Sequence, residues 1–167
     1  MRCFFRVGDM DTKTAGKIEG KNYESILKFY KPNKQMQGSA CQFDFAPEKQ
    51  AVFFEIGKQL EERKFDWANK LAFKMADVDI CKILLVLKGR SKLANLFHDP
   101  GKGNYASSED TKNNALVVQK GDFGYFFKLS QQTKDGKVNA MQISLSEDEA
   151  LLLELMLEEA IRKIYKW

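Results

Sequence analysis

The stretch "KFDWANKLAFKMADVDICKILLVLKG" at residues 64–89 contains the change of pattern that decides the fold. In its first half, mostly large apolar residues alternate with alanines and lysines, which predicts a strand over 64–75 with a core face and a basic face. Its second half changes to helical spacing, in which Asp77 can cap a helix that continues to Leu87 and Gly89 can stop it. The strand's predicted core face carries Trp67, Asn69, Leu71, Phe73 and Met75, and its basic face carries Ala68, Lys70, Ala72 and Lys74.

Three more strand-like runs precede this stretch, at 23–31, 38–47 and 50–60, and Pro32 and Pro47 separate them. Together with 64–75 they predict a four-stranded antiparallel meander. Residues 1–20 lack periodicity and contain three glycines among polar residues, which indicates a loosely attached tail. We therefore expect a flexible tail over 1–20 and one domain over 21–167, a length that buries a core without disulfides.

A second set of strands follows the helix. It comprises a short strand at 93–97 and the runs 115–122, 123–132 and 137–145. The Asp-Gly pair within 134–137 is typical of a tight hairpin turn, because it tolerates positive backbone angles. The resulting order of four strands, a helix, four strands and a helix predicts an α+β fold with two four-stranded antiparallel sheets.

The last helix begins at a capping box formed by Ser146 and Glu149 and is expected to run to about Ile164. Its apolar residues cover more than one side, so more than one surface must bury it. It either lies deep within its own domain or packs on both its own sheets and partner subunits. We favour the second alternative, because 167 residues in two sheets leave little chain to cover such a helix.

Composition points to an anionic partner and away from several classes of protein. The net charge is +4, and residues 146–167 hold six acids and three bases, so the basic surplus lies in residues 1–145. No apolar run approaches the roughly 18 residues of a membrane span. Cys3, Cys41 and Cys81 are odd in number and widely spaced, which argues against disulfides and favours a reducing compartment. A mitochondrion, a plastid and the nucleus all fit this expectation.

Catalytic and metal-binding constellations do not emerge from the sequence. His98, the only histidine, is followed by Asp99, but no nucleophile motif accompanies the pair. We expect His98 to be a turn residue bonded to backbone near Pro100. The glycine-rich runs at 101–103 and 120–124 lack the strand-to-helix context of a phosphate loop. The sequence therefore predicts a protein that is not an enzyme, without cofactor or metal.

Lysines alternate with aromatic rings in four strand-like runs, at 27–31, 53–58, 67–74 and 120–128. Single-strand binding needs this combination, because lysines neutralise phosphates and rings stack on bases. The alternative is that the rings belong to the core, as in any β-rich protein.

Four motifs occur in an order that resembles the Whirly family of plant single-stranded DNA-binding proteins over residues 23–167. These motifs are the stretch at 64–89, "LFHDPGKG" at 96–103, "GYFFKLSQQ" at 124–132 and the terminal "IYKW". The resemblance implies two sheets packed roughly perpendicular to each other, a helical kernel and a homotetramer built through the C-terminal helix and sheet contacts. It also implies binding of single-stranded DNA along the sheets with little sequence preference, in DNA repair or transcription. A related fold occurs in guide-RNA-binding proteins of kinetoplastids.

One departure from the family concerns its Lys-Gly-Lys-Ala-Ala-Leu signature. Here Gln37 and Ser39 stand where the family has lysines, although Gly38 and Ala40 match. The resemblance ties this motif to DNA binding and higher assembly, so an RNA-binding protein and an assembly subunit without strong nucleic-acid binding remain alternatives. Lys34, just upstream, can substitute for the missing charge. The predicted nucleic-acid-binding residues are Lys28, Tyr30, Lys31, Lys34, Gly38, Ser39, Phe53, Trp67, Lys70, Lys74, Lys120, Phe123, Tyr125 and Lys128.

Overall fold

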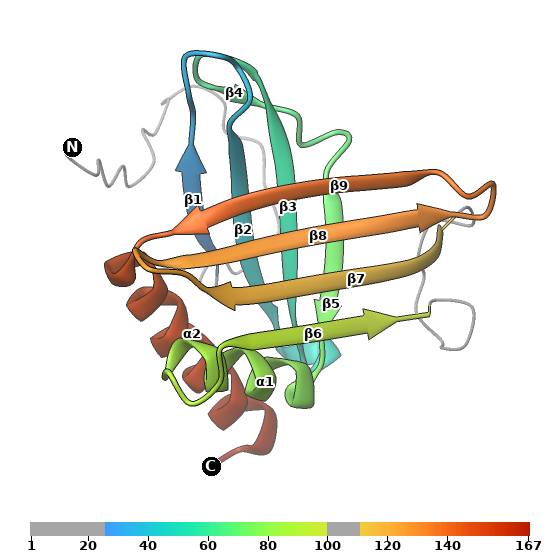
Figure 1. Cartoon of the computed structure of the whole chain (residues 1–167). Helices are drawn as coiled ribbons and strands as arrows, with labels where there is room; N and C mark the ends of the chain where they lie inside the picture. The colour runs from blue at the N-terminus through green and yellow to red at the C-terminus, as the bar shows by residue number, and fades with distance from the viewer. Residues whose placement is uncertain (1–25, 100–110) are drawn as a thin grey trace, which may run out of the picture.

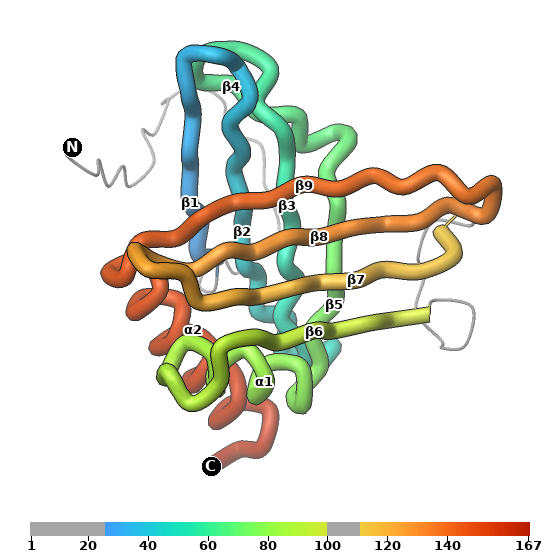
Figure 2. The backbone as a smooth tube through the Cα atoms, viewed as in Figure 1, coloured from blue at the N-terminus to red at the C-terminus, as the bar shows by residue number. Residues whose placement is uncertain are grey.

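Two antiparallel sheets cross at a steep angle, and two helices lie together at one end of the crossing (Figure 1). This computed structural model describes residues 26–99 and 111–167. The tail expected at 1–20 lies outside these residues. The α+β class, the two sheets and the two helices agree with the sequence prediction. The tube view shows the strands of the second sheet running across those of the first (Figure 2).

The first sheet has the strand order β1-β2-β3-β5, and a fifth, two-residue strand β4 pairs with β3. The continuous strand predicted over 64–75 is wrong, because a turn at 66–70 interrupts it. Asp66 closes this turn: its carboxylate accepts hydrogen bonds from the backbone and side chain of Asn69 at 2.9–3.1 Å. The strands are β1 Ile26–Lys31, β2 Ser39–Ala46, β3 Ala51–Glu61, β4 Lys64–Phe65 and β5 Leu71–Met75, with a short 3-10 helix Pro47–Lys49 between β2 and β3.

The turn also changes the predicted core face. Leu71, Phe73 and Met75 are buried, as expected from their alternation. Trp67 and Asn69 precede β5 and lie in the turn, so neither belongs to the core. A short-range side-chain bond has therefore overridden strand periodicity.

The second sheet has the order β6-β7-β8-β9, and consecutive strands pair antiparallel. Its last hairpin turns at Gly136, whose φ is +88°, and the Asp135 carboxylate accepts the backbone N–H of Lys137 at 3.2 Å. This confirms the predicted Asp-Gly turn. The strands are β6 Leu93–His98, β7 Thr111–Lys120, β8 Tyr125–Thr133 and β9 Val138–Leu145.

The core lies between the inner faces of the two sheets and is rich in phenylalanine. The Phe127 ring of β8 lies 5.8 Å, centroid to centroid, from both Phe43 and Phe54 of the first sheet. All three side chains are fully buried. Aromatic pairs at such distances add to the stabilisation that burial of their area already provides. These rings therefore hold the two sheets at their crossing.

The helices α1 (Asp77–Leu87) and α2 (Glu147–Tyr165) pack on each other and on the core. The N-cap of α1 is Ala76 and not Asp77 as expected, and the Asp79 carboxylate accepts the Ala76 N–H at 3.2 Å. Gly89 ends α1 with a φ of +69°, as predicted. Lys88, next to this end, pairs with Glu154 and Glu158 of α2.

The side of α2 that faces the core buries Ala150, Leu153, Leu157 and Ala160. Its opposite side exposes Leu151, Leu152 and Leu155. A single copy of the chain therefore leaves one side of α2 exposed, which excludes the alternative that this helix lies deep within its own domain. Neither helix among the described residues is long and apolar enough to cross a membrane.

Candidate nucleic-acid interface

The second sheet presents one face away from the core, and the described strand residues of this outer face include no carboxylate. Residues that pair directly across an antiparallel ladder share a face, so the register places Phe97, Ala115, Ser130 and Ala140 in one row. The outer face consists of Leu93, Asn95, Phe97, Asn113, Ala115, Val117, Gln119, Phe126, Lys128, Ser130, Gln132, Val138, Ala140, Gln142 and Ser144.

Two exposed rings and one lysine occupy this outer face. Phe97 and Phe126 expose 65% and 53% of their surface. Lys128 lies between Val117 and Gln142 in the register, two residues along the strand from Phe126. Exposed rings beside a cation are what sequence-tolerant single-strand binding requires, since the rings stack on bases and the cation attracts phosphate. Because none of these positions holds a carboxylate, no negative charge on this face offsets the positive potential of Lys128.

The predicted role of Tyr125 is wrong. Its ring is only 3% exposed, and its hydroxyl donates a hydrogen bond to the Leu87 carbonyl at 3.1 Å. It cannot stack on a base without leaving the core. The sequence contained the signal for the correct residue, because alternation with the apolar Phe127 and Leu129 places residue 125 inside and Phe126 outside. The same alternation around the buried Leu96 places Phe97 outside, and Phe97 is not among the predicted binding residues.

The outer side of the first sheet carries Lys28, Tyr30, Phe53 and Lys74, four of the residues predicted to bind nucleic acid. Carboxylates are interspersed there, however. Lys70 forms an ion pair with Glu55 at 2.8 Å, and Asp44 lies opposite Phe53 in the register. This side therefore mixes lysines with carboxylates, whereas the described strand residues of the second sheet's outer face include one lysine and no carboxylate.

An aromatic cluster lies at the β4 end of the first sheet. The rings of Tyr30 and Phe65 are 5.6 Å apart, and Tyr30 is about half exposed. Trp67 is half-buried above Gly57, where an added Cβ would lie 3.7 Å from the indole ring and 2.9 Å from the Asp66 carbonyl oxygen. Tyr30 remains available for stacking, whereas Trp67 also serves to pack the turn.

The β1–β2 connection uses two predicted site residues for structure. Buried Gly38 donates its N–H to the Gln59 side chain at 3.1 Å, and the Ser39 hydroxyl donates to the Gln142 carbonyl at 2.5 Å. Lys31 is paired with Glu149 at 2.6 Å. Of the four residues predicted in this region, only Lys34 is exposed and forms no side-chain hydrogen bond or ion pair with another described residue.

The Gly38→Ala variant is expected to be less stable than the wild type. A Cβ at this position would lie 2.2 Å from the Lys31 carbonyl oxygen, and backbone cannot move aside cheaply. We expect a loss of about 1–3 kcal/mol in the free energy of unfolding, measured by urea denaturation. Gln37→Ala, at an exposed neighbour, is the control and should change stability by less than about 0.5 kcal/mol. Equal stability of the two variants would contradict this packing argument.

Two further predicted residues lie where β7 turns into β8. Lys120 contacts the Tyr125 hydroxyl at 3.3 Å and Glu147 at 3.6 Å. The bond to Tyr125, with Glu147 nearby, raises the pKa of Lys120, so this lysine stays charged at neutral pH. Phe123 is 95% exposed at the tip of the turn. Lys120 pairs with the buried Tyr125 in the register, so its side chain lies on the core side of the sheet, and Phe123 alone of the two projects from the tip of the turn.

His98 is a structural residue, but not in the way expected. It is the last residue of β6 and not part of a turn. Its Nε2 lies 2.9 Å from the Asp79 carboxylate, and its ring stacks on Phe73 at 4.3 Å. It thus connects the second sheet to α1. Within residues 26–99 and 111–167 no group of three or more His, Cys, Asp or Glu could hold a metal ion. Cys41 is buried, and this burial raises the pKa of its thiol.

Solved structures of other proteins share this arrangement of two crossed sheets with two helices at one end. The structure of the plant transcriptional regulator PBF-2 matches with a TM-score of 0.67 and 21% identity, over 85% of this chain and 90% of that one. WHY1 from Arabidopsis thaliana matches with a TM-score of 0.68 and 20% identity, over 85% and 91% of the two chains. A guide-RNA-binding protein complex bound to a guide RNA matches with a TM-score of 0.59 and 15% identity, over 82% and 89%.

These structural matches show the shared fold, and the sequence itself shows the family. Residues 32–156 match the Whirly transcription factor family. The chain therefore belongs to the Whirly family. No curated protein matches the sequence.

Proposed function

We propose that this protein is a non-catalytic binder of single-stranded DNA, and that the strand lies across the outer face of the second sheet. The observation that carries the proposal is a face whose described strand residues include two exposed phenylalanines and Lys128 but no carboxylate. Family membership supports nucleic acid as the ligand, and so do the similar structures, which are a plant transcriptional regulator and a guide-RNA-binding protein complex. The same proposal includes a role for this single-stranded DNA binding in DNA maintenance, repair or transcription.

A single strand fits this face better than a duplex. Phenylalanine side chains have no hydrogen-bonding groups, so they recognise a base through its flat surface, which is stacked and hidden in a duplex. The flanking asparagine, glutamine and serine side chains can hydrogen-bond to splayed bases or sugars. Tyr30, Phe53 and the lysines of the first sheet, together with Phe123 and Lys120, extend the proposed contact beyond the outer face.

The proposal includes a homo-oligomer, with a tetramer as the family leads us to expect. The exposed leucines of α2 form one part of the contact, and Val78 and Leu85 of α1 are also exposed. Apolar residues grouped in this way on adjacent helices are typical of subunit interfaces. Assembly would place several outer faces on one particle, which would let a long strand contact more than one of them.

Binding to a labelled 30-nucleotide oligo-dT is expected to weaken steeply with salt. Each phosphate neutralised by a lysine releases condensed counterions, so the logarithm of affinity should fall linearly with the logarithm of salt, with a slope of about −0.7 per contact. Fluorescence anisotropy, measured at a series of salt concentrations from about 50 to about 300 mM, gives this slope. Unchanged affinity across that range would refute an electrostatic contact with the backbone.

Competition in the same assay separates the remaining possibilities. Unlabelled single-stranded DNA should displace the oligonucleotide, whereas a duplex of equal length should not. Displacement by single-stranded RNA at lower concentration than by DNA would favour an RNA-binding protein. Absence of binding to every nucleic acid would favour an assembly subunit whose exposed helices make protein contacts.

A further inference from the structure

The second sheet ends at β6, and the strand order places no described strand on the other side of it (Figure 1). In an antiparallel ladder, every second residue bonds to the neighbouring strand. The Lys120 N–H donates to the Lys92 carbonyl at 3.0 Å, which fixes the phase of this alternation. Residues 94, 96 and 98 therefore bond to β7, whereas the backbone groups of residues 93, 95 and 97 point towards the free edge.

Two residues leave this edge open. Leu93 is not one of them, because its carbonyl accepts the Ser91 hydroxyl at 2.9 Å and its N–H lies 3.4 Å from the same oxygen. The backbone N–H and carbonyl groups of Asn95 and Phe97 have no hydrogen-bond partner at this edge within residues 26–99 and 111–167. One chain thus offers two donors and two acceptors to an added strand.

The edges of the first sheet are protected in ways that β6 is not. β1 carries Lys28 and Lys31, and lysines on an edge strand discourage pairing with a further strand. β5 carries Lys74, and its Ala72 carbonyl accepts the Gln131 side chain at 3.4 Å. The sequence of β6, Leu-Ala-Asn-Leu-Phe-His, contains no lysine, acidic residue or proline. The usual devices that block an edge are therefore missing from this strand.

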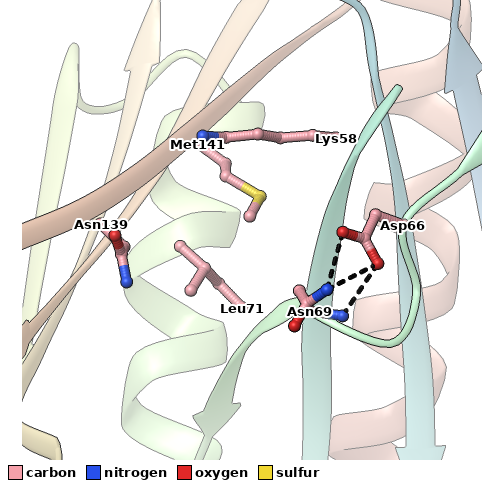
Figure 3. Close-up of a pocket in the computed structure, with 6 residues that line it drawn as sticks. All are labelled: Lys58, Asp66, Asn69, Leu71, Asn139 and Met141. Atoms are coloured by element: carbon pink, nitrogen blue, oxygen red, sulfur yellow. Dashed lines mark hydrogen bonds between the residues drawn. The ribbon is translucent and has the colours of Figure 1, made fainter. Parts of the chain in front are cut away.

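The free edge of β9 also differs from that of β6, because it lies beside the first sheet. A pocket of about 260 Å³ lies between the two there (Figure 3). In Figure 3 the Lys58 side chain extends towards Met141 of β9, so a cation flanks this edge as well. The pocket is lined by Lys58, Asp66, Asn69, Leu71, Asn139 and Met141. Among these edges of the described strands, β6 is the one that is both open and uncharged.

A second copy of β6 fits this open edge. Two antiparallel strands related by a two-fold axis make the same contacts in both directions. Asn95 of each copy can then lie opposite Phe97 of the other, and each such pair exchanges two hydrogen bonds. Every open backbone group of the edge is used in this register. A strand with lysines or carboxylates would bring like charges together across the axis, whereas β6 has neither.

The surroundings of the edge favour a second copy over a strand of another protein. α1 packs against β6 and exposes Val78 and Leu85, so apolar surface continues from the strand onto the helix. Four hydrogen bonds are too few to hold two free chains against the loss of their translational and rotational freedom. An oligomer joined through α2 raises the effective concentration of neighbouring copies, which makes the pairing favourable.

We propose that β6 pairs antiparallel with β6 of a second copy, with Asn95 of each copy opposite Phe97 of the other. The proposal rests on the homo-oligomer of the proposed function and adds a contact that α2 does not provide. The second sheets of two copies would then form one continuous sheet. The two Phe97 rings would be diagonal neighbours about 7–8 Å apart on the joined outer face, so a bound nucleic-acid strand can pass from one copy to the next.

Hydrogen–deuterium exchange resolved to single amides tests this pairing in the protein without nucleic acid. In the wild-type oligomer, the amides of Asn95 and Phe97 should exchange at least about tenfold more slowly than in separated chains. The Leu155→Lys variant, which carries a charge on the exposed side of α2, supplies these separated chains. The amides of Ala94 and Leu96 bond to β7 and should be protected in both proteins.

The outcomes separate this pairing from the proposed function. Amides of residues 95 and 97 that exchange in the wild-type oligomer as fast as in separated chains would overturn the pairing. That result would leave single-stranded DNA binding and the α2 contact intact, and the edge would be free for a strand of another protein. A wild-type mass of one chain would overturn the homo-oligomer and the pairing together.

Two variants locate the protection at the edge. Asn95→Pro removes an N–H that points away from β7, so it blocks the pairing without breaking the ladder. Asn95→Lys keeps the N–H but places a charge on the edge strand. In both variants the Phe97 amide should exchange at least about tenfold faster than in the wild type. Light scattering should show that the α2 contact persists.

Gln119→Lys is the matched control for these variants. Gln119 is also exposed on the outer face, but it lies on β7, which has a neighbouring strand on each side. A lysine there should leave the Phe97 amide protected. Protection of Phe97 that persists in both Asn95 variants, or that is lost equally in the control, would contradict pairing through β6.

Discussion

The Phe126→Ala variant is expected to bind single-stranded DNA at least about tenfold more weakly than the wild type while unfolding at the same denaturant concentration. The Phe126 ring is half exposed on the outer face, and a base stacked on an aromatic ring contributes about 1–3 kcal/mol to binding. Because the ring contributes little to the core, its removal should change the free energy of unfolding by less than about 0.5 kcal/mol. Anisotropy with oligo-dT and urea denaturation measure the two quantities.

The neighbouring residue provides a matched control with the opposite result. Phe127 is fully buried against Phe43 and Phe54, so Phe127→Ala should lower the free energy of unfolding by about 3–5 kcal/mol. Protein that remains folded should still bind DNA through an intact outer face. If Phe126→Ala destabilises the protein and leaves binding unchanged, the assignment of faces along β8 is wrong.

The second large effect is expected at the exposed side of α2. Leu155→Lys places a charge in the proposed subunit interface, so the assembly should dissociate into chains of 19.2 kDa. Lysine is a good helix former, and Glu159 one turn away can pair with it, so the helix itself should persist. Light scattering after size-exclusion chromatography measures the mass, and circular dichroism checks the helix content.

Leu60→Lys is the control for that experiment. Leu60 and Leu155 expose nearly equal fractions of their surface, 57% and 56%, but Leu60 lies on β3, away from the helices. The same charge at residue 60 should leave the mass unchanged. An unaltered mass in Leu155→Lys, or dissociation in both variants, would contradict an interface built from α2.

Much of the fold could be predicted because the patterns involved are local. Helix boundaries followed from apolar spacing and from Gly89, and the number and order of the strands of the second sheet followed from alternation and from the Asp-Gly turn. The bounds were less accurate, because β7 begins at Thr111, four residues before the predicted run, and ends at Lys120. The break in the predicted strand at 66–70 was missed because it depends on which partner the Asp66 carboxylate finds. A carboxylate that closes a turn and one that faces solvent look the same in a sequence.

The candidate site was predicted less well than the fold, for two physical reasons. Tyr125 and Phe126 are both aromatic, and only the phase of alternation with the buried Phe127 distinguishes the core residue from the exposed one. The lysines differ in their partners, and these are far away in the chain: Glu149 is 118 residues from Lys31. Ion pairs over such separations form only once the helices and sheets are in place.

Ser39 has a consequence for how the protein behaves at high concentration. Its hydroxyl occupies the Gln142 carbonyl, and that carbonyl points away from β8 along the free edge of β9. Open acceptors and donors on an edge strand recruit strands from other molecules and begin aggregation. The Ser39 hydroxyl thus occupies one of these acceptor positions, and we expect it to make edge-to-edge pairing with another molecule less favourable.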